Sequence, residues 1–230
     1  MRRLLVAVCV LFLLPKGASA QLKVEIGAKA GLNLAGLGLS SDGKLSGVNY
    51  NGRTGFHLGA YGLIRKGKFG VQPEIVFSQQ GQSYNTPNYS GLRSNLDYIN
   101  VPIIFKYYPT GGISLQVGPQ FGFLMSAKGD LVTITPSPNG PSLSVPNSNL
   151  NKDLKSYLNS TDFSIAFGAG LDLPLGLNLT FRYNYGVSNI NKYPGTSGSG
   201  SFDSPLFSVA KTQNQVIQIS ISKKLLKIGK

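Results

Sequence analysis

The stretch GLNLTFRYNYGVSNI, residues 176–190, alternates apolar and polar side chains with a period of two. Leucines, aromatics and a valine occupy one parity, and polar residues, a glycine and an arginine occupy the other: Leu177, Leu179, Phe181, Tyr183, Tyr185 and Val187 against Asn178, Thr180, Arg182, Asn184, Gly186 and Ser188. This period is that of a β-strand whose two faces meet different surroundings. The run is also longer than the ~5–6 residues of an ordinary strand in a soluble sheet. The segment therefore predicts a long strand with an apolar, aromatic face and a polar face that carries an arginine.

The same alternation returns after residue 21 and divides the chain into strands and two kinds of connection. Besides 176–190, strands are predicted at residues 24–34, 54–64, 69–79, 96–108, 113–126, 161–173 and 214–224. Short connections lie at 65–68, 109–112 and 174–176, and long connections lie at 35–53, 80–95, 127–160 and 191–213. Short turns at one rim and long loops at the other, around an even number of antiparallel strands, are typical of an outer-membrane barrel. The sequence therefore predicts an all-β fold, an eight-stranded antiparallel up-and-down transmembrane β-barrel.

The composition excludes a membrane protein built from helices. The chain has 230 residues, of which 41% are hydrophobic and 13% charged, and after residue 14 no apolar run approaches the ~18 residues of a spanning helix. In hydrocarbon every unpaired backbone N–H or C=O costs several kcal/mol, so strands cross a bilayer only as a closed barrel. The predicted strands suit the ~9–11 residues that a tilted strand needs to cross.

The first 20 residues have the three parts of a secretory signal peptide. These parts are Arg2 and Arg3, then the apolar run LLVAVCVLFLL (4–14), then the cleavage pattern ASA (18–20). We therefore expect removal of residues 1–20, a mature chain that begins at Gln21, and a barrel domain over residues 21–230. Since Cys9 is the only cysteine, the mature chain would contain none. An exported barrel of this kind belongs in the outer membrane of a Gram-negative bacterium.

Most charged residues of the predicted strands lie on the polar parity, which faces the lumen of such a barrel. The lumen candidates are Glu25, Lys29, Glu74, Lys106, Asp162, Asp172 and Arg182. Aromatic residues on the apolar parity gather near strand ends, where they are candidates for the girdles at the two membrane interfaces. The girdle candidates are Phe56, Phe77, Phe123, Phe163 and Tyr185 at the long-loop rim, with Phe69 and Tyr107 at the short-turn rim. The alternative is a soluble barrel with the aromatics inside, which would spread its charges and many glycines over the outside.

Hairpin geometry adds expectations about register, because a slip of one residue turns every side chain to the other face. We take 65–68 and 174–176 as hairpin loops. The expected cross-strand pairs are Ile64 with Phe69, Gly59 with Glu74, Leu173 with Leu177, and Gly168 with Arg182. Prolines inside strands normally mark edges or bulges, and a closed barrel has no edge. We therefore expect β-bulges at Pro73, Pro102 and Pro119.

Residues with catalytic or metal-binding chemistry are scarce. His57 is the only histidine, expected to fill the lumen, and no carboxylate pair accompanies a nucleophile, so we expect no enzyme, no metal and no cofactor. Without Arg2, Arg3 and Lys16 the net charge falls from +13 to +10. The basic residues form no aromatic-basic platform for nucleic acid. Attraction of the basic rims to anionic lipid headgroups of the outer membrane is favoured over nucleic acid, and a simple solvated surface is favoured over both.

Six segments follow one another over nearly the whole mature chain: KAGLNL (29–34), GFHLGAYGLI (55–64), VQPEIVFSQQG (71–81), LDYINVPIIFKYY (96–108), VGPQFGFLMSAK (117–128) and LGLNLTFRYNYGVSNI (175–190). Together they resemble the PorT-like outer-membrane β-barrel family of Gram-negative bacteria. The resemblance implies an eight-stranded outer-membrane barrel. That family's name comes from a member linked to protein secretion, and most members have no assigned activity. The last strand, VIQISISKKLLKIGK (216–230), lacks the terminal aromatic that outer-membrane barrels often present to the assembly machinery.

These observations favour a structural or interaction protein. Its long loops would bind a protein outside the cell, or its rim would serve an envelope or secretion assembly. In the longest loop, 127–160, Pro136, Pro138, Pro141 and Pro146 disfavour strand pairing, and NKDLKSYL (151–158) favours a short helix or cap. The alternative is a narrow pore for small solutes, although the interior of eight strands is just wide enough for side chains to fill.

Overall fold

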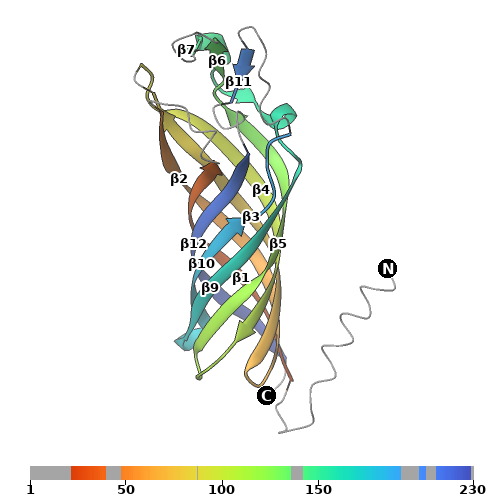
Figure 1. Cartoon of the computed structure of the whole chain (residues 1–230). Coiled ribbons are helices and arrows are strands. Elements are labelled where there is room, and N and C mark those ends of the chain that lie inside the picture. The colour runs from red at the N-terminus through yellow and green to blue at the C-terminus, as the bar shows by residue number, and fades with distance from the viewer. Residues whose placement is uncertain are drawn as a thin grey trace, which may run out of the picture.

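The computed structural model describes residues 22–39, 48–86, 88–135, 142–192, 202–205 and 211–228, so the predicted signal peptide lies outside the described residues. Eight long strands form the wall: β1 (Leu22–Leu39), β2 (Asn49–Lys66), β3 (Phe69–Asn85), β4 (Leu92–Tyr107), β5 (Ile113–Gly129), β9 (Thr161–Leu173), β10 (Leu177–Gly186) and β12 (Thr212–Ile228). They pair in the order β4-β3-β2-β1-β12-β10-β9-β5, and the pairing of β4 with β5 closes the ring (Figure 1). The predicted all-β, eight-stranded antiparallel up-and-down barrel is confirmed.

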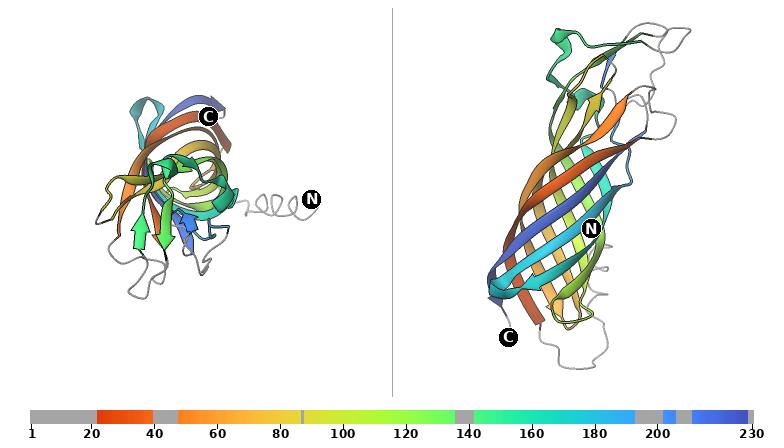
Figure 2. Two further views of the ribbon diagram at one scale, coloured as in Figure 1. Left: turned by 90° about the horizontal axis from the view of Figure 1, so that it is seen from above. Right: turned by 90° about the vertical axis from the view of Figure 1, so that its left-hand side faces the viewer.

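The barrel presents apolar side chains outward and polar side chains inward. Leu58, Leu115 and Ile221 are more than half exposed on the outside, whereas Asn33 and Ser114 on the inside are fully buried. A soluble barrel would show the reverse arrangement, so the soluble alternative is wrong. Viewed along its axis, the wall is a closed ring of tilted strands (Figure 2). No helix in the described part of the chain is long and apolar enough to span a bilayer.

Several strands extend further at the long-loop end than the sequence pattern predicts. β3 continues past residue 79 to Asn85, and β4 begins earlier than predicted, at Leu92. In this outer part the pattern is inverted, because Leu92 and Leu96 point inward and are buried while Arg93 is exposed. The inversion marks the place where the wall leaves the apolar band and enters water. A prediction that places apolar residues on the outside therefore ends these strands too early.

The hairpin registers agree with expectation at one turn and differ at the other. Between β9 and β10, the 3-10 turn η4 (Pro174–Gly176) sets the expected pairs Leu173 with Leu177 and Gly168 with Arg182, which are confirmed. Between β2 and β3 the expected pairs of Ile64 with Phe69 and Gly59 with Glu74 are wrong. The observed pairs are Lys66 with Phe69, Ile64 with Val71, Tyr61 with Glu74 and Gly59 with Val76. Gly67, with a φ of 60°, allows a tighter turn, and the shift of two residues keeps every side chain on its face.

The expectation of bulges at the strand prolines is wrong. The register runs unchanged through Pro73, Pro102 and Pro119, which pair with Ile103, Gln120 and Ile165. Each proline instead lies within a gap of two residue pairs in the ladder with the preceding strand. Proline removes one backbone N–H donor from the ladder. This loss disturbs the barrel less than a register slip of one residue, which would turn every side chain of the strand to the other face. The irregularities lie elsewhere, between Ile26 and Gly27, between Gly52 and His57, and between Asp97 and Tyr98.

The long connections build a small structure at the end of the barrel opposite to the short turns (Figure 1). It consists of β6 (Val132–Thr135), β7 (Ser142–Ser144), η2 (Asn147–Asn149), β8 (Lys152–Asp153), η3 (Lys155–Tyr157) and β11 (Phe202–Ser204). We call these elements the outer assembly. β11, β6 and β7 pair as a separate three-stranded sheet, and β8 pairs with β5. The segment 151–158 thus holds β8 and η3, while Pro136, Pro138 and Pro141 lie outside the described residues.

A hydrophobic core joins the outer assembly to the barrel wall. Its buried members, which we call the apolar cap, are Leu37, Tyr84, Leu92, Leu96, Tyr98, Leu124, Ala127, Leu131, Val132, Val145, Leu154, Leu158 and Ile190. Leu96 from the wall and Leu154 from the outer assembly are both fully buried. Burial of a leucine side chain contributes roughly 1.5–3 kcal/mol. The apolar cap therefore holds the outer assembly on the barrel.

The closed ring predicts resistance to denaturation by detergent. Because each wall strand pairs with two neighbours, SDS at room temperature should leave the mature protein folded, and heating should unfold it. On a gel, unheated and boiled samples should migrate at different positions, and circular dichroism of the unheated sample should be dominated by β-structure. Identical mobility, or a large helical signal, would contradict a closed barrel.

Candidate functional site

A carboxylate that contacts two cations lies in the middle of the lumen. Glu74 on β3 accepts from Lys29 Nζ of β1 at 2.9 Å and from Arg182 on β10, whose Nη2 lies 2.9 Å from Oε1. Gln72 donates to Glu74 Oε1 at 2.7 Å, and Gln116 accepts from Arg182 Nη2 at 3.0 Å. All five side chains are buried. The Glu74 network therefore connects strands on opposite sides of the ring across the lumen.

A second polar group surrounds the single histidine. His57 is 1% exposed and faces the lumen, as its parity predicts. Its Nδ1 lies 2.8 Å from Asn33 Oδ1 and its Nε2 lies 2.8 Å from Ser220 Oγ. Gln218 also donates to Asn33 Oδ1 at 3.0 Å. These bonds link β1, β2 and β12, so the histidine has the surroundings of a structural residue.

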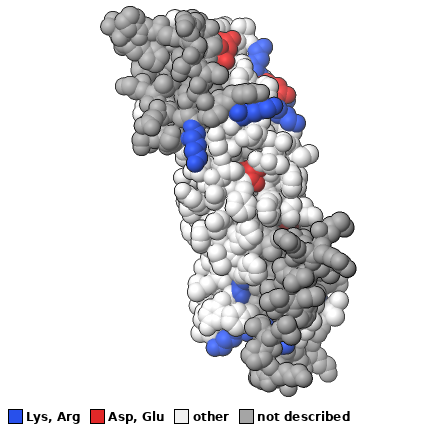
Figure 3. All heavy atoms as spheres, turned by 45° about the vertical axis from the view of Figure 1, so that its right-hand side comes forward, with Lys and Arg blue, Asp and Glu red and all other residues white. Residues whose placement is uncertain are grey.

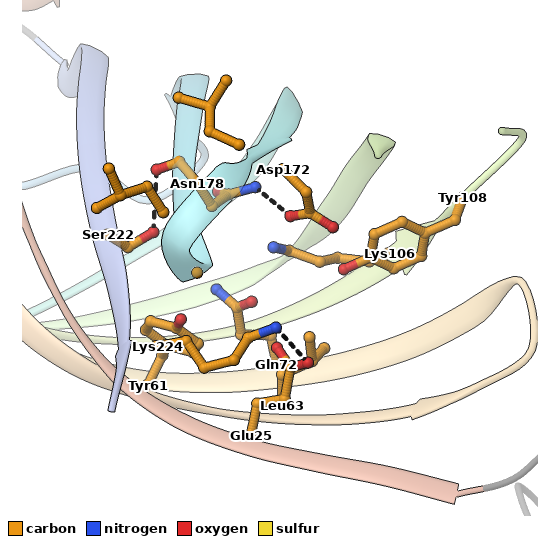
Figure 4. A pocket seen from close by; sticks show the side chains of 13 residues that line it. Glu25, Tyr61, Leu63, Gln72, Lys106, Tyr108, Asp172, Asn178, Ser222 and Lys224 are labelled. Atoms are coloured by element: carbon orange, nitrogen blue, oxygen red, sulfur yellow. Dashed lines mark hydrogen bonds and ion pairs between the residues drawn. The ribbon is translucent and has the colours of Figure 1, made fainter. Parts of the chain in front are cut away.

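The seven lumen candidates occupy different depths and do not form one network. Lys29, Glu74 and Arg182 meet at the centre. Towards the outer end, Asp162 accepts from Ser188 Oγ at 2.6 Å and from Asn214 Nδ2 at 3.0 Å. Glu25, Lys106 and Asp172 lie together at the mouth formed by the short turns, around one pocket (Figure 4).

This mouth pocket is a cavity of about 70 Å³. On one side Lys224 Nζ lies 2.6 Å from Glu25 Oε1. On the other, Asn178 donates to Asp172 Oδ1 at 2.7 Å, and Arg65 lies 4.0 Å from Asp172 Oδ2. Lys106 is 5% exposed, and its ammonium group lies between these two walls in Figure 4.

The pocket is bordered by Tyr108, which follows β4. The guanidinium of Arg65 lies 3.5 Å from the centre of the Tyr108 ring, in cation–π contact. Burial, with the negative charge of Asp172, raises the pKa of the Tyr108 phenol above its ordinary value. The phenol therefore stays protonated and can donate a hydrogen bond into the pocket.

Some residues of these sites were not among the sequence candidates. Gln72, Gln116 and Lys224 share the inward parity of their strands, so the alternation could have found them. Arg65 could not be found in this way, because its contacts depend on the fold of the short turns. Among the described residues, no three His, Cys, Asp or Glu side chains gather at a place where they could hold a metal ion.

The comparisons with known proteins agree with this architecture. The family described as "Outer membrane protein beta-barrel domain" matches residues 19–192. The chain belongs to this family. Membership places the protein in the outer membrane of a Gram-negative bacterium. The comparison with curated proteins found no match.

Several solved structures are similar to this outer-membrane barrel at low identity. Neisserial surface protein A is 12% identical, over 87% of this chain and 97% of that one, with a TM-score of 0.45. Ail, the attachment invasion locus protein of Yersinia pestis, is 14% identical, over 87% and 98%, with a TM-score of 0.42. The outer membrane protein OprG from Pseudomonas aeruginosa is 12% identical, over 90% and 96%, with a TM-score of 0.46.

The seven girdle candidates of this outer-membrane barrel lie on its outside, most of them in pairs. Phe56 contacts Phe77 with ring centres 5.9 Å apart, Phe69 contacts Tyr107 at 5.3 Å, Phe163 contacts Phe121 at 5.3 Å, and Tyr185 contacts Tyr183 at 6.5 Å. Phe123 is 46% exposed on the same surface. On the face drawn in Figure 3, charged side chains lie mostly towards the two ends, with an uncharged band between. The aromatic pairs thus lie on the outward surface of the wall, and their role as girdles at the membrane interfaces stays a prediction.

Removing the central carboxylate should destabilise the barrel strongly. Glu74→Gln keeps the shape of the side chain but leaves Lys29 and Arg182 without their shared counter-charge. Breaking a buried pair in this way costs about 3–5 kcal/mol. Asp153→Asn, a matched change at an exposed position of the outer assembly, should cost far less. Unfolding in urea from detergent micelles measures both, and equal midpoints would mean that water fills the centre of the lumen.

Proposed function

We propose that this barrel is a binding protein of the outer membrane, whose outer assembly contacts a protein outside the cell or in an envelope or secretion assembly. The observation that carries the proposal is that the long connections form a packed structure instead of separate loops. The resemblance to the PorT-like family supports the secretion assembly as one setting. We also propose that the protein is not an enzyme, because the one described hydroxyl beside the histidine, Ser220 Oγ at 2.8 Å from His57 Nε2, is buried in the packed lumen.

Contacts within the outer assembly prepare it for binding. Asp130 accepts from the backbone N–H of Arg93 at 3.0 Å and of Asn151 at 2.9 Å, which joins β4 to the long loop. Thr133 donates to Asp203 at 2.6 Å, so two loops far apart in the sequence are joined as well. A surface that is already ordered loses less conformational entropy on binding than a flexible loop. Such a surface supports a role in recognition.

Cysteine labelling tests the orientation and the partner together, because the chain has no cysteine after Cys9. Lys152→Cys lies on the outer assembly and Lys68→Cys lies in a short turn at the opposite end, and both positions are exposed. On intact cells a membrane-impermeant maleimide should modify position 152, and it should reach position 68 only after the envelope is opened. The reverse pattern would place the outer assembly in the periplasm.

A crosslinker attached at position 152 should then capture one specific protein on the cell. Leu154→Asp puts a charge into the fully buried apolar cap and should release the outer assembly, which would abolish the crosslink while the heat-dependent gel shift remains. An exposed Lys155→Asp should keep the crosslink. A crosslink that survives Leu154→Asp, or none at all, would contradict binding through the outer assembly.

The narrow pore is the alternative function, and two features of the interior oppose it. The Glu74 network spans the lumen, and the apolar cap lies at its outer end. An eight-stranded barrel leaves little space beyond its own side chains. In planar bilayers we expect no steady conductance from the wild-type protein. A stable ohmic channel, with a selectivity that changes in Lys29→Gln, would favour the pore.

A further inference from the structure

Lys106 stands out among the buried charges of the lumen. It extends from β4 into the mouth pocket, where its ammonium group is drawn between the two pocket walls (Figure 4). Within the described residues no ion pair or hydrogen bond joins its Nζ to another group, although the residue is 5% exposed. An isolated buried ammonium is costly unless an oxygen or an anion accompanies it. The pocket next to it is the place where such a partner would lie.

The other charges near Lys106 are already engaged. Glu25 pairs with Lys224, Asp172 faces Arg65 and accepts from Asn178, and the centre of the lumen shares one carboxylate between two cations. The Glu74 network and the surroundings of the mouth pocket together hold five cations and three carboxylates: Lys29, Arg65, Lys106, Arg182 and Lys224 against Glu25, Glu74 and Asp172. The excess of positive charge next to an open cavity favours an anion.

We propose that the mouth pocket binds a small oxyanion, a phosphate or carboxylate group, held by the ammonium group of Lys106. The cavity of about 70 Å³ compares with the roughly 10–15 Å³ that one water needs, so it has room for a group of several atoms. The phenol of Tyr108 points into the same pocket and supplies a neutral donor. Asp172, which lines the same pocket, repels an anion, and this repulsion limits the affinity.

The position of the pocket decides which ligands can reach it. It opens at the end of the short turns, which outer-membrane barrels direct to the periplasm. Two sources of the group have access there, namely a free oxyanion in the periplasm and the phosphate of a lipid headgroup in the inner leaflet. The chemistry is the same for both, and the site is independent of what the outer assembly binds.

The first test uses the mature protein in phosphate-free detergent solution, with inorganic phosphate as the probe and the ionic strength held constant. Phosphate should raise the thermal unfolding midpoint in a saturable way, as a ligand of the folded state does. Lys106→Met should abolish this shift. It should also raise the midpoint without phosphate, because an unpaired buried charge is replaced by an apolar chain. The matched control Lys68→Met, at an exposed turn on the same rim, should change neither quantity.

The second test changes the opposing charge. Asp172→Asn keeps the size of the side chain, removes the repulsion and should tighten phosphate binding by about threefold or more, as measured by calorimetry. If Lys106→Met lowers the midpoint without phosphate, the ammonium group already has a stabilising role and the proposal is wrong. A phosphate-dependent shift that persists in Lys106→Met also overturns it.

A third arm distinguishes the two sources. Short-chain phosphatidic acid and short-chain diacylglycerol, which lacks the phosphate, are titrated in place of inorganic phosphate. Binding of both inorganic phosphate and phosphatidic acid, lost in Lys106→Met, supports a site open to free oxyanions. Binding of phosphatidic acid alone supports a lipid headgroup. If neither ligand binds in a way that depends on Lys106, the pocket is not an oxyanion site.

Discussion

The closed hydrogen-bond ladder is the constraint on which the rest of this structure depends. In hydrocarbon no water is present to satisfy an unpaired backbone group, so the first and last strands must meet. Here β1 and β12 pair from Val24 with Ile228 to Leu39 with Thr212, along almost their whole length. Once the ring is closed, each strand has one face towards lipid and one towards the lumen. The alternation of the sequence is the direct consequence.

Closure also explains why the lumen holds paired charges. The interior is narrow, and side chains such as Arg182 and Glu74 are almost completely removed from solvent. In such surroundings a charge is costly unless a partner lies beside it, so positions that face one another across the lumen depend on each other. Glycines make this possible on the wall: Gly168 lies directly opposite Arg182, and a Cβ there would come within 3.1 Å of the Arg182 Cα. The register of the wall and the pairing of the lumen therefore depend on each other.

These dependencies separate what the sequence could predict from what it could not. A period of two is local, so it was enough to find the strands and to assign Arg182 and Phe181 to opposite faces. The first hairpin was assigned wrongly because two- and four-residue turns have the same parity, and only the backbone of Gly67 distinguishes them. The outer ends of β3 and β4 were cut short because the pattern inverts where the wall leaves the lipid. The sequence resembles the PorT-like family, whereas the family match shows only the broader outer-membrane β-barrel family.

The candidate sites also combine features that the sequence could predict with features that it could not. Parity brought Glu74 and Arg182 to the lumen, but their contact depends on how the strands are staggered around the ring. The outer assembly depends on contacts such as Thr133 with Asp203, between loops that no local pattern connects. The sequence does not reveal that Lys106 lacks a partner, since the carboxylates Glu74 and Asp172 lie on the inward parity of their strands and are candidate partners. Only their engagement with Arg182 and Asn178 leaves the lysine without one.

The interior changes in character along the axis, and this separates the two ends of the molecule. Apolar residues fill the outer end, the Glu74 network crosses the middle, and the pocket that holds the unpaired Lys106 is open at the short turns. The central network resists rearrangement, because moving any member exposes a charge to a low-dielectric interior. A ligand in the mouth pocket and a protein on the outer assembly would therefore bind independently, and the wall between them acts as a rigid support.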